Sequence, residues 1–272
     1  MQEHRSIPQS TGGDEKAFLA NALRFVALLH HATKLKTSAR RVCNGLNESL
    51  TSIVAAESLS TWQTIQIVTL DMFLMHRITE ESPAGSEDER EVVALVCEAI
   101  SGMLSAFLLP VYTLKQGASL LDYFALPATK IILDWIVLNP TVLEERGFLK
   151  RLQIWPSLCR VLNNLSDLLA EQDTDEESIA DIDEYPLPED HDLQVKLKSS
   201  WLSHNNDVKI KMTEILFPQA FAPLHPRLRE LDFKRLLRMK EERPTDEKLA
   251  FLRAQRLIDA GMALASATFQ VH

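Results

Sequence analysis

Apolar side chains recur every three or four residues along most of this chain, a pattern typical of helices that bury one face. The first such stretch follows Asp14 and Glu15, whose negative charge is favoured at a helix N-terminus. Its apolar positions are Phe18, Ala22, Phe25, Val26 and Leu29. We therefore predict a first helix beginning near residue 14.

Two longer helices are predicted next. Between residues 65 and 75 apolar side chains lie almost all round the helix, including Ile65 and Met72, which indicates a helix enclosed by others. The interval from Glu81 to Arg90 is charged, contains proline and glycine and lacks periodicity, so it predicts an exposed loop. From Val93 to Phe107 apolar residues again step by three and four, which predicts another long helix.

Prolines predict the boundaries of the following helices. Pro127 opens one helix and Pro140 closes it, because proline fits the first turn of a helix but not its interior. Pro156 opens the next helix in the same way. Its predicted buried stripe comprises Trp155, Leu158, Cys159, Leu162, Leu165 and Leu169. A final helix is expected from Thr245 and Asp246 onward.

No stretch shows the alternating pattern of a strand, so we predict an all-α fold built as an irregular array of antiparallel helical hairpins. The predicted organisation has four parts along the chain. These are a disordered tail at 1–13, a helical-hairpin array at 14–170, an acidic linker at 171–188 and C-terminal helices at 189–272 that pack on the array. The linker is predicted from the run EQDTDEESIADIDE, in which like charges repel and little can be buried.

Charge and cysteine content limit the classes of partner and compartment. The net charge is −9, and affinity for phosphate backbones depends on clustered Lys and Arg, so direct nucleic-acid binding is not expected. Cys43, Cys97 and Cys159 are odd in number and lie within apolar helical patterns. We expect all three thiols to behave as small buried hydrophobes in a reducing, intracellular compartment.

No membrane segment is expected from the sequence. The polar N-terminus, MQEHRSIPQSTGGDE, lacks the basic-then-apolar pattern of a secretory signal. The most apolar stretch, Met103 to Tyr112, is shorter than the roughly 20 residues needed to span a bilayer. We therefore expect no membrane partner.

The sequence lacks the motifs of common enzyme classes. It has no Gly-rich phosphate loop followed by Lys-Ser or Lys-Thr and no Gly-x-Ser-x-Gly element. We expect a protein that is not an enzyme, with no catalytic, cofactor-binding or metal-binding residues and no cofactor.

The acidic run leaves a calcium site as an alternative. Oxygen ligands spaced as in an EF-hand loop are Asp173, Asp175, Glu177, Asp181 and Glu184. Ser178, however, stands where the sharp turn requires glycine, and Pro186 and Pro188 prevent a proper exit helix. A solvated linker is therefore favoured over a calcium sensor or enzyme.

One basic patch is the candidate partner-binding surface. Its members gather around Phe233 and are Arg227, Arg229, Lys234, Arg235, Arg238 and Lys240. Such a patch suits an acidic partner, a phosphate or RNA. The other interpretation is a solvated helix face that pairs with the acidic linker, and this is the favoured one.

Four dispersed blocks carry a family resemblance. The stretch from Leu126 to Leu165, with Trp135 and Trp155-Pro156, resembles a block of the adaptor family named for ever-shorter telomeres and for the SMG proteins five, six and seven. The other three, in the same order, are YPLPEDHDLQ at Tyr185–Gln194, FAPLHPRLRELDF at Phe221–Phe233 and LRAQRLIDAGMALA at Leu252–Ala265. From first to last they span somewhat more than half of the chain, and they most resemble member five.

The resemblance implies a non-enzymatic scaffold in nonsense-mediated mRNA decay. Relatives recognise the phosphorylated decay helicase, pair with a second adaptor and recruit dephosphorylation and decay factors, so the implied location is cytoplasmic with shuttling to the nucleus. In the family these helices follow a 14-3-3-like domain, and no binding residue of that domain has a match here. The segment KLKSSWLSHNNDVKIKMTEILFPQA separates blocks that are nearly contiguous in relatives. The alternative function is a general helical-repeat interaction module unrelated to RNA decay.

Overall fold

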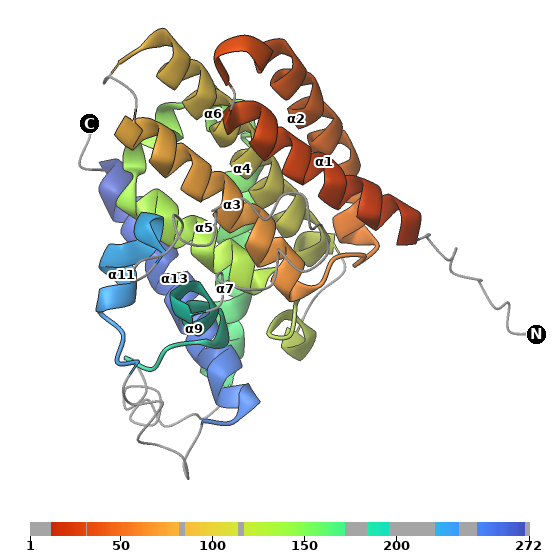
Figure 1. Ribbon diagram of the computed structural model, residues 1–272. Coiled ribbons are helices and arrows are strands. Elements are labelled where there is room, and N and C mark those ends of the chain that lie inside the picture. The colour runs from red at the N-terminus through yellow and green to blue at the C-terminus, as the bar shows by residue number, and fades with distance from the viewer. Residues whose placement is uncertain are drawn as a thin grey trace, which may run out of the picture.

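A computed structural model describes residues 12–30, 32–81, 85–113, 117–171, 184–195, 221–233 and 244–269. All regular secondary structure in these ranges is helical, which confirms the predicted all-α fold (Figure 1). Residues 1–11 of the predicted tail and 172–183 of the predicted acidic linker lie outside the described ranges.

Two hairpins form the N-terminal half of the array. The first pairs α1 (Gly12–His30) with α2 (Ala32–Ala55), and the second pairs α3 (Thr61–Glu81) with α4 (Glu87–Thr113). The hairpins stack, because α2 packs on α4 and α1 on α3. Short connections make consecutive helices antiparallel neighbours, as expected for such arrays.

The faces of α1 and α3 are buried as their periodicity predicts. Phe18, Phe25 and Leu29 of α1 are buried against the array. In α3, six consecutive residues from 64 to 69 are buried, and neighbours on several sides include α1, α4 and α5. The prediction of a helix enclosed by others is therefore confirmed.

Capping explains a mistaken loop prediction. The interval Glu81–Arg90 is not one exposed loop, because α3 extends to Glu81 and α4 already begins at Glu87. Ser86 caps α4 by accepting the backbone N–H of Glu89 at 3.1 Å. The acidic residues at 87–89 occupy the first turn, where the helix dipole stabilises negative charge.

The longest helix, α4, is central to the array. It packs against α2, α3, α5 (Leu126–Leu138), α6 (Arg146–Leu149) and α7 (Ile154–Glu171). The part of α4 from Glu87 to Leu109 is long and apolar enough to cross a membrane by length and composition. This apolar stretch is longer than the predicted one, Met103 to Tyr112. Since 72% of this stretch is buried inside the protein, packing against its neighbours accounts for its apolar character.

The proline-bounded helix is found as predicted. It is α5, it has Pro127 in its first turn, and its residues 126–136 are all buried. Short 3-10 helices flank it, η1 (Gly117–Leu120) before and η2 (Pro140–Glu144) after. Trp135 is 3% exposed, so it belongs to the core.

In α7, one predicted core position is wrong. The helix begins at Ile154, two residues before Pro156, and buries Leu158 and Leu165 as expected. Cys159 is exposed, because it lies one residue beyond Leu158 and one helical step turns it away from the core. Trp155 is half-buried and stacks on Phe148, with ring centroids 6.5 Å apart.

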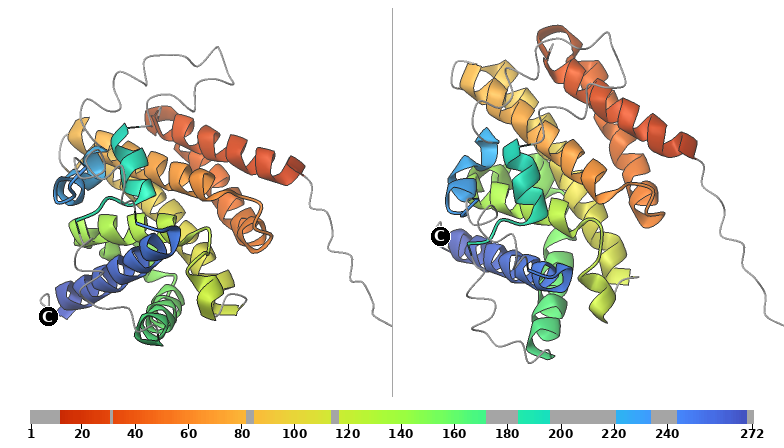
Figure 2. Two further views of the ribbon diagram at one scale, coloured as in Figure 1. Left: turned by 90° about the horizontal axis from the view of Figure 1, so that it is seen from below. Right: turned by 60° about the horizontal axis from the view of Figure 1, so that its bottom comes forward.

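The remaining elements cover the side of α5. The long helix α13 (Asp246–Phe269) packs on both α5 and α7 (Figure 2). Three short elements lie nearby, namely α9 (Pro188–Val195), η4 (Ala222–Leu224) and α11 (His225–Arg229). Most buried apolar residues form one large core, whereas Tyr185, Leu187 and Leu252 form a small separate cluster.

One buried acid gives the fold a pH dependence. Burial raises the pKa of Asp71 in α3 to about 8, whereas an unfolded aspartate titrates near pH 4. The folded state therefore binds an extra proton between these values, and stability should fall as pH rises from about 4 to about 8, by up to about 1.4 kcal/mol per pH unit. Asp71→Asn should flatten this decline, as measured by urea unfolding at pH 5 to 8.

The exposed Asp167→Asn variant in α7 is the matched control, and it should keep the wild-type pH dependence. Equal pH slopes for wild type and Asp71→Asn would contradict the assignment of this proton to Asp71.

Candidate functional site

A lysine within the most buried helix is the starting point of a charge cluster. Lys130 lies in α5 and is 5% exposed. Its Nζ donates to Oδ2 of Asp134 at 3.0 Å and to Oδ1 of Asp190 at 2.9 Å. Burial alone would lower the pKa of Lys130, but the carboxylates of Asp190, Asp134 and Glu189 outweigh it and raise that pKa. The lysine therefore stays charged inside the protein.

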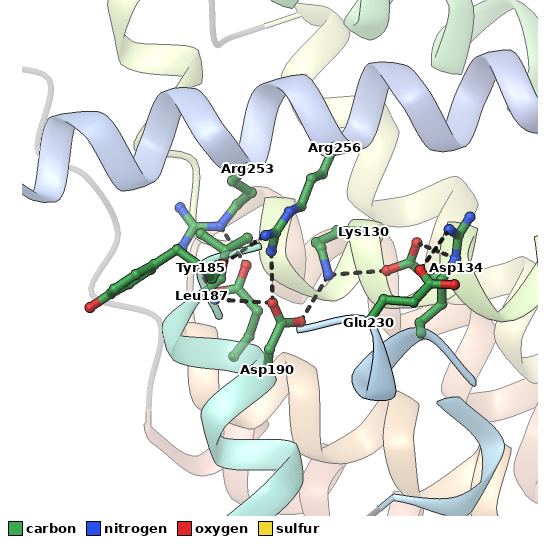
Figure 3. A network of polar contacts seen from close by, with 10 residues as sticks. Lys130, Asp134, Tyr185, Leu187, Asp190, Glu230, Arg253 and Arg256 are labelled. Atoms are coloured by element: carbon green, nitrogen blue, oxygen red, sulfur yellow. Dashed lines mark hydrogen bonds and ion pairs between the residues drawn. The ribbon is translucent and has the colours of Figure 1, made fainter. Parts of the chain in front are cut away.

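Asp190 is the point at which three elements meet. Besides Lys130 of α5, its carboxylate accepts Nη1 of Arg256 from α13 at 3.1 Å and the backbone N–H of Leu187 at 3.0 Å. The last bond also caps α9, because an acid in the first turn reaches back to the N-cap amide. Figure 3 shows Asp190 lying between Lys130 and Arg256.

The neighbouring acid is held by a two-pronged ion pair. Arg253 of α13 places Nε 2.7 Å from Oε1 of Glu189 and Nη2 2.9 Å from Oε2. Such bidentate pairs fix geometry and strengthen each hydrogen bond. Burial alone would lower the pKa of Arg253, but the hydrogen bond and the attraction to Glu189 outweigh burial, so the pKa is raised. Glu189 is 2% exposed, so the pair is largely removed from water.

Apolar and backbone contacts complete the arrangement. Tyr185 and Leu187, just before α9, pack against Leu252 of α13. Nη2 of Arg256 donates to the backbone carbonyl of Tyr185 at 2.7 Å. We call this whole set the clasp, and its members are Lys130, Asp134, Tyr185, Leu187, Glu189, Asp190, Leu252, Arg253 and Arg256. It holds segment 184–195 on the surface formed by α5 and α13.

Two members of the predicted basic patch, Arg227 and Arg229, lie in α11. Arg227 of α11 lies at the edge of the clasp, with Nε 3.9 Å from Oδ1 of Asp134 and Nη1 3.5 Å from Oε2 of Glu230. At 3.9 Å the first contact is too long for a hydrogen bond, and Nε has no hydrogen-bond partner among the described residues. Arg229 is exposed and donates from Nε to Nε2 of His225 at 3.1 Å.

The other four members of the patch, Lys234, Arg235, Arg238 and Lys240, lie outside the described residues. The patch therefore stays a prediction. Of the run proposed as calcium ligands, only Glu184 falls within the described part of the chain, so that alternative also stays open.

The clasp residues were not predicted from the sequence, although one signal was present. Lys130 and Asp134 are four residues apart in the otherwise apolar helix ATKIILDWIV, and a charged pair on a buried helix requires partners from elsewhere. Glu189 and Asp190 belong to the first turn of α9, where acidic residues are common for local reasons and do not by themselves indicate distant partners. Arg253 and Arg256 are three residues apart, which places both on one face of α13.

A shallow groove between α1 and α2 is a second surface feature. Its volume is about 520 Å³, and its lining mixes apolar and polar side chains. Phe18 and Ile53 represent the apolar part, and Asn21, Arg41 and Ser49 the polar part. Such a mixed lining suits a polypeptide better than an enclosed small molecule.

Two comparisons with known proteins bear on function. A family model described as "Est1 DNA/RNA binding domain" matches residues 2–198. The zebrafish (Danio rerio) protein "Nonsense-mediated mRNA decay factor SMG7" is 29% identical over a match 158 positions long, which covers 55% of this chain but 12% of that relative. The family match includes α9 with its two clasp acids and ends before α13.

Proposed function

Since this chain belongs to the Est1 DNA/RNA binding domain family, whose model matches residues 2–198, we propose that it is a non-catalytic helical scaffold of an adaptor in nonsense-mediated mRNA decay. The observation that carries the proposal is the similarity to the zebrafish decay factor. The hairpin array supports it, because stacked helices offer extended surfaces for protein partners.

The partners proposed are the phosphorylated decay helicase, a second adaptor of the family, and phosphatase or decay factors. The proposed location is the cytoplasm, with shuttling to the nucleus. The sequence blocks favour member five, whereas the relative found carries the name of member seven. We therefore propose a role common to both members, which does not depend on choosing between them.

Co-immunoprecipitation from zebrafish cells tests the proposal. The epitope-tagged protein should recover the decay helicase or a second adaptor of the family. An unrelated helical-repeat protein carrying the same tag is the control, because it offers a similar architecture without the family surfaces. Recovery of neither partner above that control would contradict the adaptor role and favour a general interaction module.

The description of the family as a DNA/RNA binding domain also raises nucleic-acid binding as a second candidate. The net charge of −9 and the pairing of Arg227 with carboxylates argue against it. Titration of the chain into labelled single-stranded RNA at two salt concentrations separates the two functions. Saturable, salt-dependent binding would replace the proposal of a purely protein-binding scaffold.

A further inference from the structure

We infer that the surface carrying Lys130, Arg253 and Arg256 is a docking site for an acidic peptide of a protein partner, and that segment 184–195 occupies it as an internal ligand. This inference goes beyond the adaptor role. It does not depend on that role either, because peptide binding can be measured with the chain alone.

Charge is unevenly distributed across the clasp. The array side supplies three cations, Lys130 from α5 and Arg253 and Arg256 from α13. It also supplies one carboxylate, Asp134 of α5, which pairs with Lys130 and leaves the array side with a net positive charge. The segment side supplies two adjacent carboxylates, Glu189 and Asp190. We call the surface that carries Lys130, Arg253 and Arg256 the cradle. Neighbouring like charges repel one another unless an anion is bound between them, so the cradle suits an acidic occupant.

The same contacts define what the cradle selects. Tyr185 and Leu187 pack against Leu252, in a cluster separate from the main core. The two carboxylates follow four and five residues after Tyr185. Each carboxylate meets its own arginine, and Asp190 also meets Lys130. The expected ligand is therefore a short peptide with two apolar side chains followed closely by two adjacent carboxylates.

The helices that carry the cradle also pack on one another without the segment between them. Close helix packing joins α13 directly to α5 and α7. In contrast, α9 has eight residues, fewer than the roughly 12 at which an isolated helix becomes even marginally stable in water. Its stability therefore comes from the clasp, and local release of such an element is less costly than global unfolding.

Tethering explains why the internal segment is the resident ligand. A covalently linked segment has an effective concentration on the order of millimolar, so a free peptide competes poorly with it. The apparent affinity of a free peptide equals its intrinsic affinity multiplied by the fraction of molecules in which the cradle is open. Neutralising Glu189 and Asp190 should therefore weaken the hold of the internal segment on the cradle, so that a separate peptide can bind there.

A binding assay with three forms of the full chain tests the inference. The probe is a fluorescein-labelled peptide with the sequence of residues 184–195. The double variant Glu189→Gln/Asp190→Asn should bind the probe at least about tenfold more tightly than the wild type does, because its own segment competes less. Adding Arg253→Ala to the double variant should reverse this gain. A probe with the same Gln and Asn changes should bind at least about tenfold more weakly.

A folded double variant that does not bind the probe, or binds the Gln- and Asn-substituted probe equally well, would overturn the inference. Folding is checked by circular dichroism. If the double variant does not fold, hydrogen exchange of the wild type decides instead. Segment 184–195 exchanging faster than α5 and α13 would support separate release, whereas equal rates would show that the cradle opens only on global unfolding and would overturn it.

Discussion

Replacing Lys130 by alanine should lower the free energy of unfolding by about 3 kcal/mol, because it leaves buried carboxylates without their shared cation. Removing one partner of a buried ion pair costs about 3–5 kcal/mol. We expect the lower end of this range, because Asp190 keeps Arg256 and the backbone amide of Leu187. Among the described residues, the cation that Asp134 keeps is Arg227, whose Nε is 3.9 Å away. Urea unfolding followed by circular dichroism measures the loss.

Lys16→Ala is the control for Lys130→Ala, since Lys16 is an exposed lysine on α1. Its effect should stay within about 0.5 kcal/mol, as for most surface substitutions. A similarly small loss for Lys130→Ala would mean that water reaches the carboxylates, and the clasp would then contribute little to stability.

Gly147→Ala should destabilise the protein by roughly 3 kcal/mol, at the upper end of the usual cost of overpacking. A Cβ at this position would meet the carbonyl carbon and oxygen of Cys97 and the amide nitrogen of Glu98, all at 2.7 Å. These are backbone atoms of α4, so no side-chain rotation can relieve the clash. The change should push α6 away from α4 and disturb the buried Phe148. A lower thermal midpoint is the expected readout.

Gly45→Ala gives a matched control on α2, because nothing lies within 4 Å of a Cβ placed there. Alanine is favoured over glycine inside a helix by about 0.5–1 kcal/mol, so this variant should be more stable than the wild type. If both glycine variants shifted stability in the same direction, the close approach of α6 to α4 would be in doubt.

Local sequence patterns predicted those helices whose ends or burial depend on neighbouring residues in the chain. Pro127 and Pro140 bound α5 because proline restricts its own backbone and that of the preceding residue, which depends on no distant contact. The apolar character around the whole of α3 likewise anticipated its burial. The same reasoning failed at Glu87–Glu89, where a polar, non-periodic run is also the ordinary composition of a helix N-terminus.

The clasp could not be predicted in the same way, because its bonds join residues far apart in the chain. Lys130 and Asp190 are 60 residues apart, Glu189 and Arg253 are 64 apart, and Asp190 and Arg256 are 66 apart. Neither periodicity nor composition reports such pairings. Grouping basic residues by their position in the sequence likewise could not report the contact of Arg227 with Asp134, which comes from a different helix.

The position of α13 in the chain has a consequence for biosynthesis. On the ribosome, α5 and the clasp acids emerge before the two arginines that neutralise them, and α13 is the last described helix. Until it arrives, the apolar sides of α5 and α7 that it later covers lack their partner. A nascent chain stalled before residue 245 would therefore expose uncovered apolar surface, on which chaperones and proteases act, and its two clasp acids would lack their arginine partners.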